Sequence, residues 1–143
     1  MNLLDVNLLI ALCDADHVHH RPAAQWFRAH RPDGWATCPL TENGLLRIMG
    51  HTGYPGGPGS PQEVRPLLQR LRSVPGHLFW DDTISVADSQ ALPSLQGVTS
   101  RQLTDVYLLA LAVHRGGGLA TLDSRIDPSR VPGGQQALVL IPH

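Results

Sequence analysis

The sequence contains no lysine, and all eleven of its basic residues are arginines. Twelve acidic residues oppose them, so the formal net charge at pH 7 is −1. This balance excludes a broad electrostatic attraction to nucleic acid, although arginine is well suited to recognising individual phosphate groups. A codon bias toward GC explains the missing lysine as well, because glycine, proline and alanine are abundant.

Cysteine and long apolar runs are also scarce. Cys13 and Cys38 are too few for a disulfide scaffold and fit a reducing compartment. No stretch approaches the roughly 20 apolar residues of a membrane span, and no basic leader precedes the first apolar stretch. We therefore expect a cytoplasmic protein with no membrane association. The length of 143 residues predicts a single domain, residues 1–143, with a substantial core.

Short apolar segments alternate with helical patterns along the chain. We expect strands at residues 2–5, 35–38, 77–80, 118–123 and 137–141. We expect helices beginning near residue 8 and at 19–30, 39–51, 61–73 and 99–114, with a short helix at 85–92. The glycine- and proline-rich stretch 53–61 predicts a loop, and Thr99 with Gln102 fits a capping box for the helix 99–114. The alternation predicts a three-layer α/β/α sandwich with a central, mainly parallel sheet of about five strands.

Two aspartates follow predicted strands. Asp5 interrupts the apolar run LLDVNLLIAL, and Asp123 ends the strand that contains LATL. Because the carboxyl ends of parallel strands share one edge of a sheet, we expect both carboxylates on that edge. For each residue alone, a turn or a helix cap is an equally good interpretation.

Two further acids lie on predicted helices. The helical neighbours of Asp105 are apolar except for Arg101, which makes a surface position unattractive, and an ion pair with Arg101 is the structural alternative. Glu42 lies in the first turn of the helix after strand 35–38, where a charge complementing the helix dipole is the alternative.

Four carboxylates gathered on one edge would repel one another unless some were protonated or a divalent cation neutralised them. Mg²⁺ and Mn²⁺ prefer oxygen ligands, and such a site suits the activation of water against a phosphodiester. No glycine-rich phosphate-binding loop competes with this interpretation.

Other polar groups have simpler interpretations. The stretch DHVHH at 16–20 is better explained as the polar start of a helix or as an RNA-facing surface than as a zinc site, which needs further ligands. Asp81 and Asp82 predict a turn. Arg47, Arg101 and Arg125 lie near acidic positions and could contact phosphates or form structural ion pairs.

The chain resembles a known family in three stretches: LLDVNLLIAL, TEN followed by an apolar helix, and LTDVYLLALAVHRGGGLATLD. These resemble the PIN domain and, within it, the VapC-like toxins of bacterial type II toxin–antitoxin pairs. The resemblance covers essentially the whole chain and is most specific across residues 104–123. It implies a central parallel sheet and an endoribonuclease that hydrolyses RNA by metal-activated water, with Mg²⁺ or Mn²⁺ as cofactor.

The resemblance also implies roles for individual residues. The family's acidic quartet, which is both catalytic and metal-binding, matches Asp5, Glu42, Asp105 and Asp123. Asn7 matches the small polar residue that helps to hold the first aspartate, and Thr121 matches a threonine two residues before the last one. All four acidic positions are filled, and the long loop 53–61 is the one departure from the family pattern.

The implied partners are a cognate antitoxin, an RNA substrate (tRNA, rRNA or mRNA) and a second copy of the chain in a homodimer. Two rival functions remain open from the residues. A phosphatase of the haloacid dehalogenase type also carries an aspartate after its first strand, but it needs a second aspartate where Asn7 stands. A catalytically inert PIN-like module that binds RNA or protein is the non-enzymatic alternative.

Overall fold

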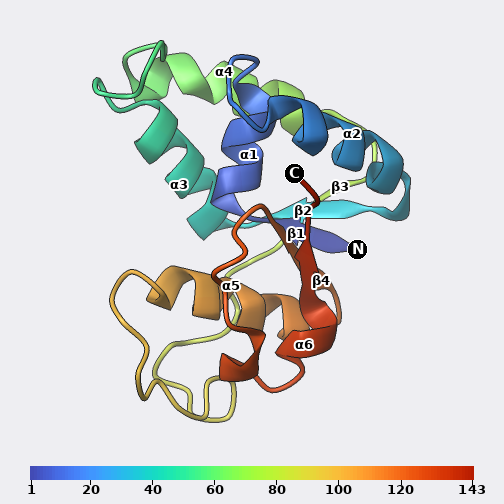
Figure 1. The fold of residues 1–143 in the computed structure, drawn as a ribbon, viewed down its shortest axis with the longest axis vertical. Helices are drawn as coiled ribbons and strands as arrows, with labels where there is room; N and C mark the ends of the chain where they lie inside the picture. The colour runs from blue at the N-terminus through green and yellow to red at the C-terminus, as the bar shows by residue number, and fades with distance from the viewer.

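Five short parallel strands form the centre of the molecule, with helices on both faces of the sheet (Figure 1). The computed structural model describes residues 1–143. The strands are β1 (Asn2–Leu4), β2 (Trp35–Thr37), β3 (His77–Phe79), β4 (Gly118–Thr121) and β5 (Leu138–Leu140). The α-helices are α1 (Val6–Cys13), α2 (His20–His30), α3 (Pro39–Met49), α4 (Pro61–Arg72), α5 (Leu103–His114) and α6 (Gly134–Ala137). Two 3-10 turns, η1 (Arg31–Asp33) and η2 (Pro128–Arg130), complete the chain.

Successive residues of the central strands point into two different cores, as the pleat of a strand requires. In β1, Leu3 packs in the core that contains α5, whereas Leu4 packs in the core that contains α1. In β4, Leu119 and Ala120 divide in the same way. Helices α1 to α4 cover one face of the sheet and α5 and α6 cover the other (Figure 1). The predicted α/β/α sandwich is therefore confirmed.

The sheet order is β3-β2-β1-β4-β5, and every neighbouring pair is parallel. The sheet is thus wholly rather than mainly parallel, and all five strands end on one edge. Leu4 of β1 pairs with Ala120 of β4, and the N–H of Asp5 donates to the carbonyl oxygen of Ala120 at 2.9 Å. The residues that follow β1, β2 and β4 consequently lie close together on this edge.

The helix predicted at 99–114 begins later than expected, at Leu103. The N–H of Thr99 donates to Oε1 of Gln102 at 3.0 Å, which is half of the predicted capping box. The Thr99 hydroxyl does not accept the N–H of Gln102, which would be the other half. The residues between Thr99 and Gln102 form a turn instead of a helix.

The short helix predicted at 85–92 is wrong, since these residues form turns. The side chains of Ser85 and Asp88 accept hydrogen bonds from the N–H groups two residues later, at 3.1 and 2.9 Å. Such local bonds compete with the helical pattern. Ile84 and Leu92 belong to the core at the two ends of this segment, and Ala91 packs against it.

Other element ends differ from prediction by one or two residues. The second strand ends at Thr37, the following helix ends at Met49, and Ala137 belongs to α6 and not to the last strand. The predicted loop 53–61 is confirmed up to Ser60, since Pro61 begins α4. No helix combines the length and hydropathy that crossing a membrane requires.

Candidate active site

Asp5 is the most deeply buried of the four predicted acidic residues, at 3% exposure. Its Oδ1 accepts the N–H of Val6 at 2.7 Å and so caps α1, which is the structural role considered from the sequence. Its Oδ2 accepts the hydroxyl of Thr121 at 2.7 Å, a bond that a helix cap does not need. Burial raises the pKa of the Asp5 carboxyl, and these hydrogen bonds oppose the rise.

Asn7 and Thr121 connect the ends of β1 and β4. The side-chain amide of Asn7 donates to Oδ2 of Asp5 at 3.3 Å and to Oγ1 of Thr121 at 3.1 Å. Its carbonyl oxygen accepts the N–H of Leu122 at 3.1 Å. Since Thr121 is fully buried, this network fixes the position of the Asp5 carboxylate relative to both strands.

Asp123 lies two residues beyond β4, where its N–H donates to Oγ1 of Thr121 at 3.0 Å. Both of its carboxylate oxygens accept from Arg125, with Nε at 3.0 Å from Oδ1 and an Nη at 3.2 Å from Oδ2. The side chain of Arg125 is 89% exposed and that of Asp123 is 19% exposed. The hydrogen bonds from Arg125 lower the pKa of the Asp123 carboxyl.

Asp105 comes from the first turn of α5 and makes no side-chain hydrogen bond or ion pair. The ion pair with Arg101 considered from the sequence is absent, because α5 begins at Leu103 and Arg101 lies outside the helix. Burial, followed by the nearby charges of Asp5 and Asp123, raises the pKa of Asp105 from 3.8 to about 6. The structure therefore brings these three aspartates within mutual electrostatic influence.

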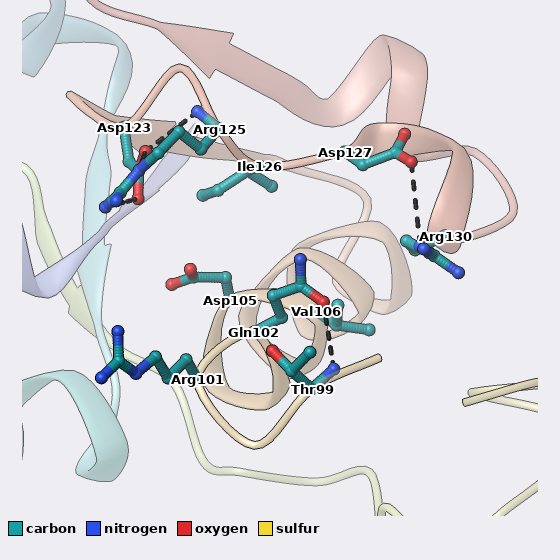
Figure 2. Close-up of a pocket in the computed structure, with 10 residues that line it drawn as sticks. All are labelled: Thr99, Arg101, Gln102, Asp105, Val106, Asp123, Arg125, Ile126, Asp127 and Arg130. Atoms are coloured by element: carbon teal, nitrogen blue, oxygen red, sulfur yellow. Dashed lines mark hydrogen bonds and ion pairs between the residues drawn. The ribbon is translucent and has the colours of Figure 1, made fainter. Parts of the chain in front are cut away.

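A cavity of about 350 Å³ opens beside Asp105 and Asp123 (Figure 2). Three arginines, Arg101, Arg125 and Arg130, contribute to its lining. Figure 2 shows Asp105 facing the side of the cavity where Arg125 is paired with Asp123. Most of the residues that line the cavity are polar or charged.

The carboxylate of Glu42 bonds to residues other than the three aspartates. Its Oε2 accepts the hydroxyl of Thr37 at 2.6 Å, and its Oε1 pairs with Arg72 at 3.4 Å. Oγ1 of Thr37 is also 2.7 Å from Nε2 of His77. Glu42 lines a separate groove between α3 and α4 that includes Arg65 and Arg72.

Thr37, Arg72 and His77 are the neighbours of Glu42 that sequence reasoning missed. Thr37 ends an apolar strand on the same edge as Asp5, a signal that could have identified it. Arg72 and His77 are distant in sequence and carry no comparable local pattern.

Other polar residues near these elements make local structural contacts. Asp127 caps η2 through the N–H of Ser129 at 3.0 Å and lines the edge of the cavity. Asp81 lies in the expected turn, where its carbonyl oxygen accepts the N–H of Thr83 at 2.9 Å. His17 lies in a turn before α2, whereas His20 begins that helix.

The carboxylates do not form a preassembled metal cage. No group of three or more histidine, cysteine, aspartate or glutamate side chains is placed to hold a metal ion. The carboxylate of Asp123 is paired with Arg125, and the carboxylate of Glu42 is bonded to Thr37 and Arg72. The donor chemistry nonetheless fits a hard divalent cation, because the mutual repulsion that helps to raise the pKa of Asp105 is what such a cation would relieve.

Comparison with known proteins agrees with the fold. The family model described as the PIN domain matches residues 3–132. The chain is 41% identical over 131 residues to "Ribonuclease VapC44" of Mycobacterium tuberculosis, which covers 92% of each chain. It is 41% identical over 126 residues to "Ribonuclease VapC38" of the same organism, covering 88% of this chain and 87% of the relative. It is 42% identical over 123 residues to "Ribonuclease VapC29", covering 85% of each. The chain therefore belongs to the PIN-domain family and, within it, to the VapC-like group.

Proposed function

We propose that this chain is an endoribonuclease and the toxin of a type II toxin–antitoxin pair. Its relatives are named ribonucleases, and they match it over most of their length. The observation that carries the proposal is the convergence of Asp5, Asp105 and Asp123 beside a charged cavity. Asp105 in particular has no structural partner, and burying its carboxylate beside two others is unfavourable without a ligand.

We propose Mg²⁺ or Mn²⁺ as the cofactor, held by Asp5, Asp105 and Asp123, with Glu42 as the fourth acid of the site. A divalent cation bound there would supply Lewis-acid chemistry, activating water and offsetting the charge of an RNA phosphodiester. Carboxylate oxygens are the ligands that both ions prefer.

The chain's own residues prepare this site before any ligand arrives. Asn7 and Thr121 hold Oδ2 of Asp5 in place, so little ordering of that side chain is needed on binding. Asp105 has no competing partner, and with a pKa of about 6 it is mostly charged at neutral pH. Thr37 and Arg72 anchor the two oxygens of Glu42 near the end of β2.

Mutation of Asp5 tests the proposal because it removes one site carboxylate. We expect Asp5→Asn to lose cleavage of total RNA while retaining the wild-type circular dichroism spectrum, since asparagine keeps the shape of the side chain. Asp127→Asn is the matched control: it removes an exposed acid at the edge of the same cavity and should cleave normally. Undiminished cleavage by Asp5→Asn contradicts the site assignment. If the wild-type protein hydrolyses phosphomonoesters and does not cleave RNA, the alternative function as a phosphatase of the haloacid dehalogenase type is favoured.

The proposed partners are a cognate antitoxin, a tRNA, rRNA or mRNA substrate, and a second copy of the chain. Expression of the chain alone should arrest bacterial growth, and co-expression of the small gene next to it should relieve the arrest. Growth arrest by Asp5→Asn to the wild-type extent would contradict a toxin that acts through its nuclease site.

A further inference from the structure

Arg125 is placed where a cation would bind if the proposed function is correct. Its guanidinium contacts both carboxylate oxygens of Asp123, at 3.0 and 3.2 Å. Its backbone N–H also donates to Oδ1 of Asp123 at 2.9 Å. No other residue shares the guanidinium, and the side chain is 89% exposed.

The guanidinium and a divalent cation are alternative ligands for Asp123. Both are positive and both are attracted to the same carboxylate oxygens, so the two compete for Asp123. Because the ion pair is exposed, it is weak and readily exchanged. Arrival of a cation therefore releases Arg125 without disturbing the buried network around Thr121.

The released guanidinium remains at the cavity beside the site carboxylates (Figure 2). Its planar fork suits the oxygens of a phosphate, and the chain has no lysine to do this work. The other paired arginine of the cavity is held elsewhere: Arg130 donates to the carbonyl oxygen of Gln96 at 2.7 Å and lies 3.7 Å from Asp127. Arg125 is thus the cavity arginine whose availability depends on the state of Asp123.

We propose that Arg125 is a phosphate-binding residue for the RNA strand, stored on Asp123 in the cation-free protein and transferred to a substrate phosphate when the cation binds. This inference rests on the proposed function. It gives the exposed ion pair two linked effects: it weakens cation binding in the absence of RNA and strengthens RNA binding once the cation is present. A purely structural ion pair would have neither effect.

Arg125→Ala separates these effects because it removes the guanidinium and keeps the backbone N–H that orients Asp123. Calorimetry with MnCl₂ on the RNA-free protein should show Mn²⁺ binding tightened by roughly two- to fivefold, as expected for loss of an exposed competing pair. Cleavage kinetics should show KM for RNA raised about tenfold by loss of a charged hydrogen bond, with kcat changed less than KM. For Arg125→Lys, which keeps the positive charge, we expect a smaller rise in KM than for Arg125→Ala.

Arg130→Ala is the matched control for the first effect, since it removes the same charge from the same cavity without touching Asp123. Its Mn²⁺ affinity should equal that of the wild type. Unchanged or weaker Mn²⁺ binding by Arg125→Ala, or an unchanged KM, would overturn the inference. The variant Asp123→Asn shows whether a negative result concerns Arg125 alone or the proposed metal site as a whole. If Asp123→Asn binds Mn²⁺ and cleaves RNA normally, the assignment of the metal site is wrong.

Discussion

Replacement of Asp105 by asparagine should stabilise the cation-free protein while it inactivates the enzyme. The side chain of Asp105 is half-buried and makes no hydrogen bond, and the negative charges of Asp5 and Asp123 repel its carboxylate. A pKa raised from 3.8 to about 6 corresponds to at most about 3 kcal/mol opposing folding above pH 6. Partial exposure reduces this to about 1 to 2 kcal/mol. A gain of that size raises the melting temperature of a chain of this length by roughly 3 to 6 °C.

The pH dependence of this gain gives the assay its specificity. The pKa of Asp105 is higher in the folded than in the unfolded protein, so its carboxylate destabilises the fold above about pH 6 and the effect fades toward pH 4. Thermal unfolding of the wild type and Asp105→Asn in EDTA should therefore differ at about pH 8 and converge at about pH 4. Asp127→Asn, which changes an exposed acid already hydrogen-bonded to Ser129, should show no such gain. An Asp105→Asn variant less stable than the wild type at pH 8 would refute the reasoning.

Three further substitutions test other parts of the structure. Asn7→Ala should lower the free energy of unfolding by about 2 kcal/mol in urea titrations, because it removes a side chain that bonds both strand ends; a loss below about 0.5 kcal/mol would contradict this. Thr37→Val should reduce RNA cleavage roughly tenfold and raise the Mg²⁺ concentration needed, since Glu42 loses a 2.6 Å hydrogen bond; wild-type kinetics would show that this anchor is unimportant. Tyr54→Phe should cost about 1 kcal/mol of stability by removing a 2.5 Å hydrogen bond to Asp14, with no change in cleavage rate; a slower reaction would place the loop 53–61 in substrate binding.

The sequence predicted the sheet and two of its edge residues well because their signals are local. Buried parallel strands appear as short apolar runs, and a polar residue that ends such a run lies on the common edge. This reasoning located Asp5 and Asp123 at the ends of β1 and β4. Helical periodicity identified Asp105 on a largely apolar face, and the electrostatic influence of the other two aspartates agrees with that placement.

What the sequence did not reveal has both local and long-range causes. The helix α5 begins at Leu103 because local hydrogen bonds order the preceding segment as turns, and Arg101, the alternative partner considered for Asp105, therefore lies outside the helix. The role of Glu42 as the fourth acid stays a prediction, and the sequence did not reveal that Thr37 and Arg72 from α4 bond its two oxygens. The contact with Arg72 was not predictable, since it requires the packing of α4 against α3, whereas Thr37 at the end of β2 carried a local signal.

Cleavage of RNA with and without a divalent cation tests the central claim most directly. Purified protein should be incubated with total RNA in excess EDTA, then with added Mg²⁺ or Mn²⁺, beside Asp5→Asn prepared identically to detect any contaminating nuclease. The account predicts no cleavage in EDTA, discrete cleavage when either ion is restored, and none by the variant. Equal cleavage by the wild type in EDTA and in Mg²⁺, absent from the variant, would contradict a metal-dependent ribonuclease built on these aspartates.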